Sequence, residues 1–363
     1  MANLTSRSYF QLWVIAAFLL FQNTSTSHLP SPENHAPLFI FGDSLFDTGN
    51  NNNPTSSACY WPYGETFFKH PTGRASDGRL IPDFIAEYAK LPFPLPYRQT
   101  RNRQLRYGVN FASGGAEVLG VNPDKIIIHL KGQLSNFKNV KKRLRHKLGD
   151  SETEALLSKA IYLFSFGTND YAKVTDDFSV LHYYSSEEYV GMVVGNFTTG
   201  LKEIYKNGGR KFAFVSLGAV GCLPNMRAKN SSGGCMEQVT VLVKLHNKEF
   251  SYVLMKLQKQ LQGFKYSNFD FYNSLSRRIK HPSKYGFKEA KTACCGTGPF
   301  RGITSCGGVG TPIKEFEVCD DPSEYLFFDS HPSEKANHQF SKLMWRGSVD
   351  VTRPYNLKQL FQL

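Results

Sequence analysis

Short apolar runs alternate with longer amphipathic segments from about residue 37 to residue 347. Five runs have the length and composition of buried strands, at residues 38–41, 107–111, 161–166, 212–217 and 266–271. Helices are expected over residues 80–88, 136–148, 187–205 and 237–261, and a last one begins at Ser333 with Glu334 in its first turn. This alternation predicts an α/β protein, a three-layer α/β/α sandwich around a five-stranded parallel sheet.

The N-terminus has the order of a secretory signal peptide. Residues 1–27 contain one charged residue, Arg7, followed by the apolar run 12–21 and then a polar stretch of small residues. Ten apolar residues are too few for a comfortable membrane span, which needs about 20, although a buried helix or an anchor is the alternative. We therefore predict a signal peptide at 1–27, secretion, and a single domain over 28–363, because no repeat or linker divides the rest.

Cysteine usage fits an oxidising compartment. All seven cysteines follow the predicted signal peptide: Cys59, Cys222, Cys235, Cys294, Cys295, Cys306 and Cys319. Disulfides are expected there, with 222 and 235 able to close a short loop and the last four able to staple an irregular stretch. An odd total leaves one thiol over, Cys59 being a candidate, and the pairing stays open. No CxxC or HExxH motif supports a metal site, whereas Asn196 and Asn230 begin glycosylation acceptor motifs.

The chain is basic, with 43 Lys and Arg against 30 Asp and Glu and a net charge of +13. The positive charges cluster at Arg98, Arg101, Arg103 and Arg106, and again at Lys138, Lys141, Lys142, Arg143, Arg145 and Lys147. Nucleic acid is not an expected partner, because no binding motif is present in a chain predicted to be secreted. The cluster predicts attraction to an anionic surface, such as acidic wall polysaccharide or lipid headgroups, or it is a solvated helix face.

Candidate chemistry lies near the two ends of the chain. There is no GxSxG, Walker A or GxGxxG motif. Instead, the first predicted strand leads directly to Ser44, at the sheet edge where open α/β folds place their sites. Near the C-terminus, Asp329 and His331 follow another apolar run. A serine hydroxyl needs an imidazole base and an acid that orients the base, so these three residues suggest nucleophilic catalysis.

The residues around Ser44 resemble the opening block of the plant GDSL-type esterase/lipases, members of the SGNH hydrolases. Phe-Gly-Asp-Ser-Leu stands at 41–45 and Asp-Thr-Gly-Asn-Asn at 47–51. Further matches follow in order at residues 61–64, 73–74, 76–79, 110–116, 167–170, 221–224, 294–296 and 325–336. The resemblance implies the flavodoxin-like sandwich of SGNH hydrolases, a serine esterase or lipase activity on carboxylic esters, and no cofactor.

The resemblance also implies a role for each matching residue. Ser44 corresponds to the nucleophile, and its own N–H contributes to the oxyanion hole. Gly115, or Gly114, corresponds to the glycine that offers a second N–H, and Asn169 to the side-chain amide donor. His331 corresponds to the general base and Asp329 to the acid that orients it.

The last block departs from the family pattern, because only Ser330 separates Asp329 from His331 where two residues are usual. Aligned on His331, the usual acid position holds Phe328. Either the loop re-forms so that Asp329 meets the imidazole, or His331 uses another acid or none.

Three functions therefore stay open: a secreted serine esterase or lipase, a catalytically impaired binding or scaffold protein, and a carbohydrate acetyl esterase. Four aromatic residues after the Ser44 block either line an acyl pocket or belong to the core: Trp61, Tyr63, Phe67 and Phe68.

Overall fold

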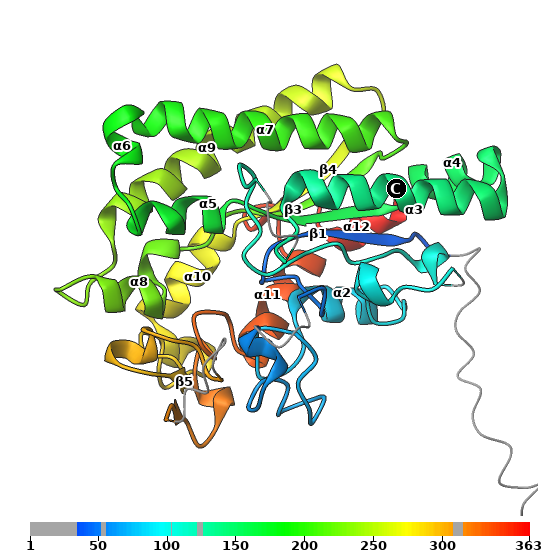
Figure 1. Ribbon diagram of the computed structural model, residues 1–363. Helices are drawn as coiled ribbons and strands as arrows, with labels where there is room; N and C mark the ends of the chain where they lie inside the picture. The colour runs from blue at the N-terminus through cyan, green and yellow to red at the C-terminus, as the bar shows by residue number, and fades with distance from the viewer. Residues whose placement is uncertain (1–34, 52–55, 103, 122–125, 308–314) are drawn as a thin grey trace, which may run out of the picture.

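A five-stranded sheet organises the part of the chain that the computed structural model describes, residues 35–51, 56–102, 104–121, 126–307 and 315–363 (Figure 1). Its order is β1 (Leu38–Gly42), β2 (Ile161–Ser165), β3 (Lys211–Val215), β4 (Lys265–Phe269) and β7 (Thr352–Pro354). The first four strands are parallel and β7 is antiparallel to β4. The predicted α/β architecture is confirmed, and the predicted signal peptide lies outside the described residues.

The strand predicted at 107–111 is wrong as a member of this sheet. Residues 109–113 do run beside β1, with the Ile40 N–H donating to the Val109 carbonyl at 2.9 Å, but the pairing amounts to an isolated bridge at Asn110. Gly108 has a φ of +106°, and a Cβ there would lie 1.9 Å from the Leu38 carbonyl oxygen, so the chain bends as it reaches β1. The fifth strand is β7 instead, a three-residue edge strand that ends at Pro354. Its sequence contains no apolar run from which a strand could be predicted.

Helices cover both faces of the sheet. One face carries α3 (Leu130–Leu148), α7 (Ser186–Lys206) and α9 (Glu237–Gln260), and the other carries α2 (Ile81–Tyr88), α10 (Phe271–Lys280), α11 (Glu334–Arg346) and α12 (Leu357–Gln362). The helices expected at five places are thus confirmed, although α3 begins six residues earlier than expected. Among the described residues, no helix is both long and apolar enough to cross a membrane.

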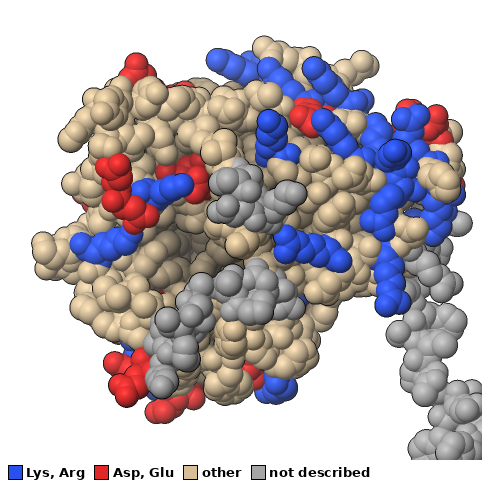
Figure 2. All heavy atoms as spheres, in the orientation of Figure 1, with Lys and Arg blue, Asp and Glu red and all other residues tan. Residues whose placement is uncertain are grey.

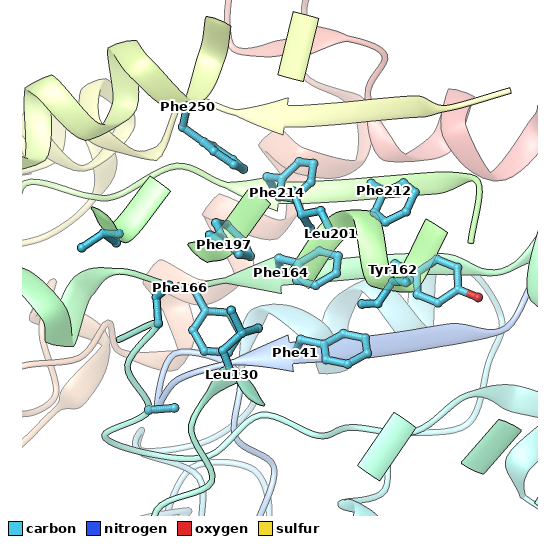
Figure 3. Packing of buried hydrophobic residues seen from close by; sticks show 14 of the residues in the cluster. Phe41, Leu130, Tyr162, Phe164, Phe166, Phe197, Leu201, Phe212, Phe214 and Phe250 are labelled. Carbon is cyan, nitrogen blue, oxygen red and sulfur yellow. The ribbon is translucent and has the colours of Figure 1, made fainter. Parts of the chain in front are cut away.

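Alternate strand residues point to opposite faces, as the period of two requires. On the α3, α7 and α9 side the sheet presents aromatic rings that stack from strand to strand, such as Phe41 on Phe164 with centroids 5.0 Å apart (Figure 3). Phe197 and Phe250 from the helices pack onto these rings. β1, β2 and β3 are buried along nearly their whole length, which explains why they read as short apolar runs, whereas Ser267 and Asn268 interrupt the run of β4.

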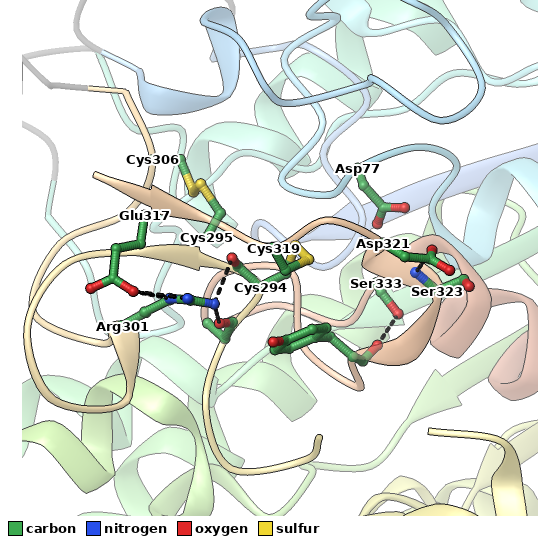
Figure 4. The surroundings of a disulfide bond; sticks show 12 residues. Asp77, Cys294, Cys295, Arg301, Cys306, Glu317, Cys319, Asp321, Ser323 and Ser333 are labelled. Carbon is green, nitrogen blue, oxygen red and sulfur yellow. Dashed lines mark hydrogen bonds and ion pairs between the residues drawn. A yellow bond between two sulfur atoms is a disulfide. The ribbon is translucent and has the colours of Figure 1, made fainter. Parts of the chain in front are cut away.

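The remaining α-helices and strands are short and lie in the connections, as do several 3₁₀ turns. They are the helices α4 (Asp150–Lys159), α5 (Thr168–Ala172), α6 (Val180–Tyr183) and α8 (Pro224–Lys229), and the strands β5 (Cys295–Gly296) and β6 (Glu317–Val318). Disulfides close two of the connecting segments: Cys222–Cys235 closes one, and Cys294–Cys319 and Cys295–Cys306, shown in Figure 4, hold the other. Cys59 lies outside these three pairs, with its Sγ 3.9 Å from the Asn51 carbonyl oxygen.

Candidate active site

Ser44 lies just past the carboxyl end of β1, and the end of that strand is fixed from two sides. The Gln133 side chain, from α3, accepts a hydrogen bond from the Gly42 N–H at 2.9 Å and donates one to the Gly42 carbonyl at 2.8 Å. A Cβ at Gly42 would lie 2.5 Å from the Ser165 carbonyl oxygen, so glycine lets β1 approach β2 at this point. The Ser44 hydroxyl therefore projects from a rigid strand end.

The structure brings Ser44, His331 and Asp329 together. Ser44 Oγ lies 2.6 Å from His331 Nε2, and His331 Nδ1 lies 2.7 Å from Asp329 Oδ1. Asp329 is buried, and the hydroxyl of the fully buried Tyr63 donates to its Oδ2 at 2.8 Å. Two short hydrogen bonds therefore link the candidate nucleophile to the base and the base to the acid. The hydroxyl of Tyr63 is the hydrogen-bond donor for the second oxygen of the acid.

The shortened block at 329–331 still places Asp329 beside His331, because the loop closes tightly between Phe327 and Pro332, which form an antiparallel bridge. The Phe328 N–H donates to the His331 carbonyl at 2.8 Å, and the His331 N–H donates to Asp329 Oδ1 at 2.7 Å. Phe328, which occupies the usual acid position, is buried, with its ring centroid 5.2 Å from that of Tyr63.

Opposite charges set the protonation of this pair. Burial alone would raise the pKa of Asp329, but the charge on His331 and the hydrogen bonds from His331 and Tyr63 outweigh it, so the pKa lies below its ordinary value. Burial would likewise lower the pKa of His331, but the charge and hydrogen bond of Asp329, with a smaller contribution from Asp43, raise it. Burial raises the pKa of Asp43 to about 6. The imidazole is thus a stronger base than a free one.

Three candidate oxyanion donors, the N–H groups of Ser44 and Gly115 and the side-chain amide of Asn169, belong to residues that line one cavity. The Gly114 N–H donates to Asp47 Oδ2 at 2.9 Å, whereas the N–H groups of Ser44 and Gly115 have no acceptor among the described residues. Gly115, rather than Gly114, is therefore the glycine with a donor to offer, and its φ of +78° suits glycine. Asn169, in the first turn of α5, is oriented by donating from Nδ2 to the Ala116 carbonyl at 2.9 Å.

Asp47 positions the loop that contains Gly114 and Gly115, a role that could not be recognised from the sequence. Its buried carboxylate accepts hydrogen bonds from the N–H groups of Gly49, Asn50 and Asn51 as well as Gly114. The Asn51 side chain donates to the Gly114 carbonyl at 2.7 Å, so both the N–H and the carbonyl of Gly114 are held. Such a role is visible only in contacts across more than 60 residues.

A second set of contacts holds the segment after His331. The Ser76 hydroxyl donates to the Pro332 carbonyl at 3.1 Å, and Asp77 Oδ1 accepts from the Glu334 N–H at 2.7 Å. Arg79 pairs with the Glu334 carboxylate at 2.6 Å. The residues at 76–79 therefore fix the start of α11, and with it the position of His331.

A cavity of about 460 Å³ opens over Ser44, and Figure 2 shows this side of the molecule hollowed near its centre. Asp43, Ser44, Gly115, Asn169, Asp329 and His331 all line it. The interpretation of the four aromatic residues as an acyl pocket is wrong, because none of them is among the described residues that line this cavity. Trp61 is 60% exposed, whereas Tyr63 is fully buried behind Asp329.

The other candidate residues lie away from the cavity. Asn196 is exposed on α7, whereas the Asn230 amide donates to the carbonyls of Gly234 and Cys235 within the loop closed by Cys222–Cys235. No group of three or more His, Cys, Asp or Glu residues that could hold a metal ion occurs in the described part of the chain.

Most of the basic cluster lies within α3, and Figure 2 shows Lys and Arg gathered on that side of the molecule. Several members have partners: Arg106 pairs with Glu152, Lys138 with Glu203 and Arg145 with Asp150. Arg103 lies outside the described residues.

Comparison with known proteins gives consistent matches. Residues 38–344 match the family model described as GDSL-like Lipase/Acylhydrolase. The chain is 49% identical to GDSL esterase/lipase 2 of Arabidopsis thaliana over 91% of this chain and 90% of that protein. It is 48% identical to a GDSL lipase of Tanacetum cinerariifolium, over 92% and 89% of the two chains. It is also 34% identical, over 90% and 75%, to an Arabidopsis protein named inactive GDSL esterase/lipase-like protein 25.

Proposed function

The chain belongs to the GDSL lipase/acylhydrolase family and is a carboxylic ester hydrolase, and from this premise we propose that it is a secreted serine esterase that acts through Ser44, His331 and Asp329. The observation that carries the proposal is the pair of hydrogen bonds, 2.6 Å and 2.7 Å long, that links the three side chains at the wall of the cavity. A base that contacts both a nucleophile and an orienting acid is the arrangement that nucleophilic catalysis requires.

The proposed reaction has two halves. In the first, His331 Nε2 takes the Ser44 proton while Oγ attacks the ester carbonyl carbon, and the carbonyl oxygen becomes an oxyanion. The N–H groups of Ser44 and Gly115 and the Asn169 amide stabilise that oxyanion. Its collapse breaks the bond to the alcohol, which leaves with the proton from His331.

In the second half, His331 removes a proton from water, and the resulting hydroxide attacks the acyl-Ser44 ester. A second oxyanion forms in the same place and collapses, with the proton from His331 returning to Ser44 Oγ. The products are a carboxylic acid and the regenerated enzyme. Asp329 holds the imidazole in the required tautomer throughout and stabilises its charged form.

The test is labelling of the purified protein by a fluorophosphonate probe, together with hydrolysis of a nitrophenyl acetate ester. The matched variants are Ser44→Ala and Ser251→Ala, the latter at an exposed serine of α9. Labelling and turnover should disappear in the first variant and persist in the second. A folded wild-type protein that neither labels nor turns over would overturn the proposal.

That negative result would instead favour the impaired binding or scaffold protein. The one-residue-shorter block and the relative named as inactive motivate this alternative, whereas the contact between Asp329 and His331 argues against it. A carbohydrate acetyl esterase would use the same three residues, so only substrate preference separates it from an esterase of longer acyl groups.

Residues 1–27 are proposed to act as a signal peptide, with 28–363 forming a single mature domain. The three disulfides support an oxidising compartment. Asn196 is the better proposed glycosylation site, because it is exposed, whereas the Asn230 side chain is engaged within a disulfide-closed loop. Mass spectrometry of the protein secreted from plant cells would test both the new N-terminus and the occupancy of the two sites.

The basic cluster is proposed to favour an anionic surface, such as wall polysaccharide or lipid headgroups. Because the attraction between exposed charges is screened by salt, elution from an anionic matrix should shift to lower salt when Lys141, Lys142 and Arg143 are all changed to Gln. Elution at unchanged salt would leave a solvated helix face as the better interpretation.

A further inference from the structure

Two of the three candidate oxyanion donors come from different segments of the chain. Gly115 belongs to the loop at residues 113–119, whereas Asn169 lies in the first turn of α5. An oxyanion hole stabilises a transition state only when its donors are already in place as the charge develops. The contacts that join the loop to α5 therefore decide how well the two donors act together.

Asp170 makes the buried contacts between the loop and α5, and we call this set of contacts the Asp170 clasp. Its Oδ1 accepts from the Val118 N–H at 3.1 Å and from the Leu119 N–H at 2.9 Å, and its Oδ2 lies 2.9 Å from the same Val118 nitrogen. Asp170 is 2% exposed and is not among the described residues that line the cavity. Hydrogen bonds to a charged acceptor are stronger than those between neutral groups, so the clasp holds the loop firmly.

The short helix α5 gives the clasp a fixed base. The Tyr189 hydroxyl, from α7, donates to the Asp170 carbonyl at 2.9 Å. The Tyr171 hydroxyl lies 2.8 Å from His246 Nδ1 on α9, and both of these side chains are buried. α5 is thus tied to two long helices on the same face of the sheet, and the Asp170 carboxylate passes that position on to the loop.

The other contacts between the loop and α5 are less able to set the geometry. Lys173 pairs with Glu117 at 3.2 Å, but the Lys173 side chain is 67% exposed, and exposed ion pairs contribute little. Asn169 Nδ2 donates to the Ala116 carbonyl at 2.9 Å, which uses one of its two hydrogens. The place of the Ala116 carbonyl therefore sets the direction of the second hydrogen, so a shift of the loop would misplace Asn169 as well as Gly115.

We propose that Asp170 is a positioning residue of the oxyanion hole, which sets where the Gly115 N–H and the Asn169 amide lie relative to each other. The inference rests on the proposed function, because it assumes that these donors stabilise an oxyanion formed at Ser44. Burial raises the pKa of Asp170 to about 6 against the effect of its backbone hydrogen bonds, so the carboxylate is ionised at pH 8, where the assays are run.

Hydrolysis of a nitrophenyl acetate ester tests the role of Asp170. Asp170→Ala removes both acceptor oxygens, so it should lower kcat at least about tenfold while KM changes less than about threefold. Asp170→Asn can place its one oxygen at Oδ1, which contacts both N–H groups, so its kcat should recover to within about fivefold of wild type. Wild-type kcat in folded Asp170→Ala protein, or an Asn variant as slow as the Ala variant, would overturn the proposal.

Asn356→Ala is the matched control for a general loss of stability. Asn356 Oδ1 accepts from the Gln359 N–H at 3.0 Å at the start of α12, and neither residue is among the described residues that line the cavity. This variant should lower Tm and leave kcat unchanged, and a fall in kcat as large as that of Asp170→Ala would overturn the proposal. If Asp170→Ala does not fold, Asp170→Glu, which keeps the charge but displaces the carboxylate, replaces it.

A double-mutant cycle shows whether Asp170 acts through the oxyanion hole. When Asn169 is already Ala, adding Asp170→Ala has one donor fewer to misplace, so its cost in kcat should be at least about threefold smaller than in the wild-type background. Two effects that multiply in full would show that Asp170 acts independently of Asn169 and would overturn the proposal.

Hydrogen exchange separates failure of this inference from failure of the proposed function, because it needs no turnover. In Ser44→Ala protein, mass spectrometry of peptides that contain residues 118 and 119 reports on the two N–H groups of the clasp. Adding Asp170→Ala should speed their exchange at least about tenfold, and adding Asn356→Ala should leave it unchanged. Faster exchange in the Asp170 variant would support the clasp even if wild-type protein proved inactive, whereas unchanged exchange would overturn it even if Ser44 proved to be the nucleophile.

Discussion

Tyr63→Phe removes one hydroxyl group, and the contacts of that hydroxyl allow the expected loss in the free energy of unfolding to be estimated. That hydroxyl donates to Asp329 Oδ2 at 2.8 Å inside a fully buried contact, whereas Oδ1 receives both the Nδ1 and the backbone N–H of His331. Phenylalanine keeps the ring but leaves one carboxylate oxygen buried without a donor. Hydrogen bonds to charged groups contribute about 1.5–3 kcal/mol, so the free energy of unfolding at pH 7 should fall by about this amount.

The pH dependence of this loss has a definite sign. The pKa of Asp329 is depressed in the folded protein, so its stabilising contribution is present above the unfolded value of about 3.9 and is lost as pH falls through the folded pKa. Because the unfolded state is common to both proteins, the difference between wild type and Tyr63→Phe should be constant near pH 7 and should shrink in acid, as pH falls first through the folded pKa of Asp329 in the variant and then through the lower one in the wild type. Catalysis should drop by about tenfold or less, because Oδ1 still orients His331.

Urea unfolding at several pH values and hydrolysis of a short-chain ester measure both effects. Tyr252→Phe is the matched control, because Tyr252 is 50% exposed on α9 and its change should cost nothing measurable. Equal unfolding free energies for the two variants at pH 7 would refute the account of Tyr63 as a donor to an ionised acid. A loss of kcat as large as that of an Asp329 variant would show that the phenol also places the imidazole.

Three further substitutions separate the parts of the site. Asp329→Asn should lower kcat by about 10⁴ because the tautomer of His331 is no longer fixed, and it should move the acidic limb of kcat/KM to lower pH because the charge that raises the pKa of His331 is gone; an unchanged limb would contradict this. Asn169→Ala should lower kcat by about 10²–10³ while fluorophosphonate labelling slows but persists, and full activity would remove Asn169 from the oxyanion hole. Asp47→Ala should release the Gly114 N–H and lower kcat more than it raises KM, as single-turnover kinetics would show, and a pure KM effect would argue against a positioning role.

The parts of the fold that could be predicted from sequence are those in which each segment carries its own signal. β1, β2 and β3 are buried on both faces, so most of their residues are apolar, and the long helices show apolar residues at helical spacing. The fifth strand has no such signal, because three edge residues ending in proline are stabilised by pairing with β4 alone. The run at 107–111 carries the composition of a strand, but its geometry depends on how Gly108 approaches Leu38.

The residues of the candidate site also divide into those with a local sequence signal and those placed by distant contacts. Ser44 follows directly from the end of a strand, and Asp329 and His331 from the end of an apolar run, so their types and places were visible. Tyr63 was not, because a buried tyrosine reads as one more aromatic residue and its partner lies 266 residues away. The wall of the cavity could not be located from sequence for a similar reason: it is built from segments after four different strands, whereas the aromatic residues that offered an acyl pocket as one of two interpretations all lie close to Ser44 in the chain.

The shortened block at 329–331 shows how tertiary contacts decide what a local motif does. With one residue fewer between acid and base, chain geometry alone leaves the position of the Asp329 carboxylate undetermined. The Cys294 and Cys295 N–H groups donate to the Phe327 and Phe328 carbonyls, so the disulfide-held strand β5 fixes the entry to the loop. Ser76 fixes its exit at Pro332, and the Tyr63 hydroxyl donates to Oδ2, which leaves Oδ1 to the N–H and Nδ1 of His331. The acid is therefore placed by three distant segments, which is why the deletion changes the local sequence without separating Asp329 from His331.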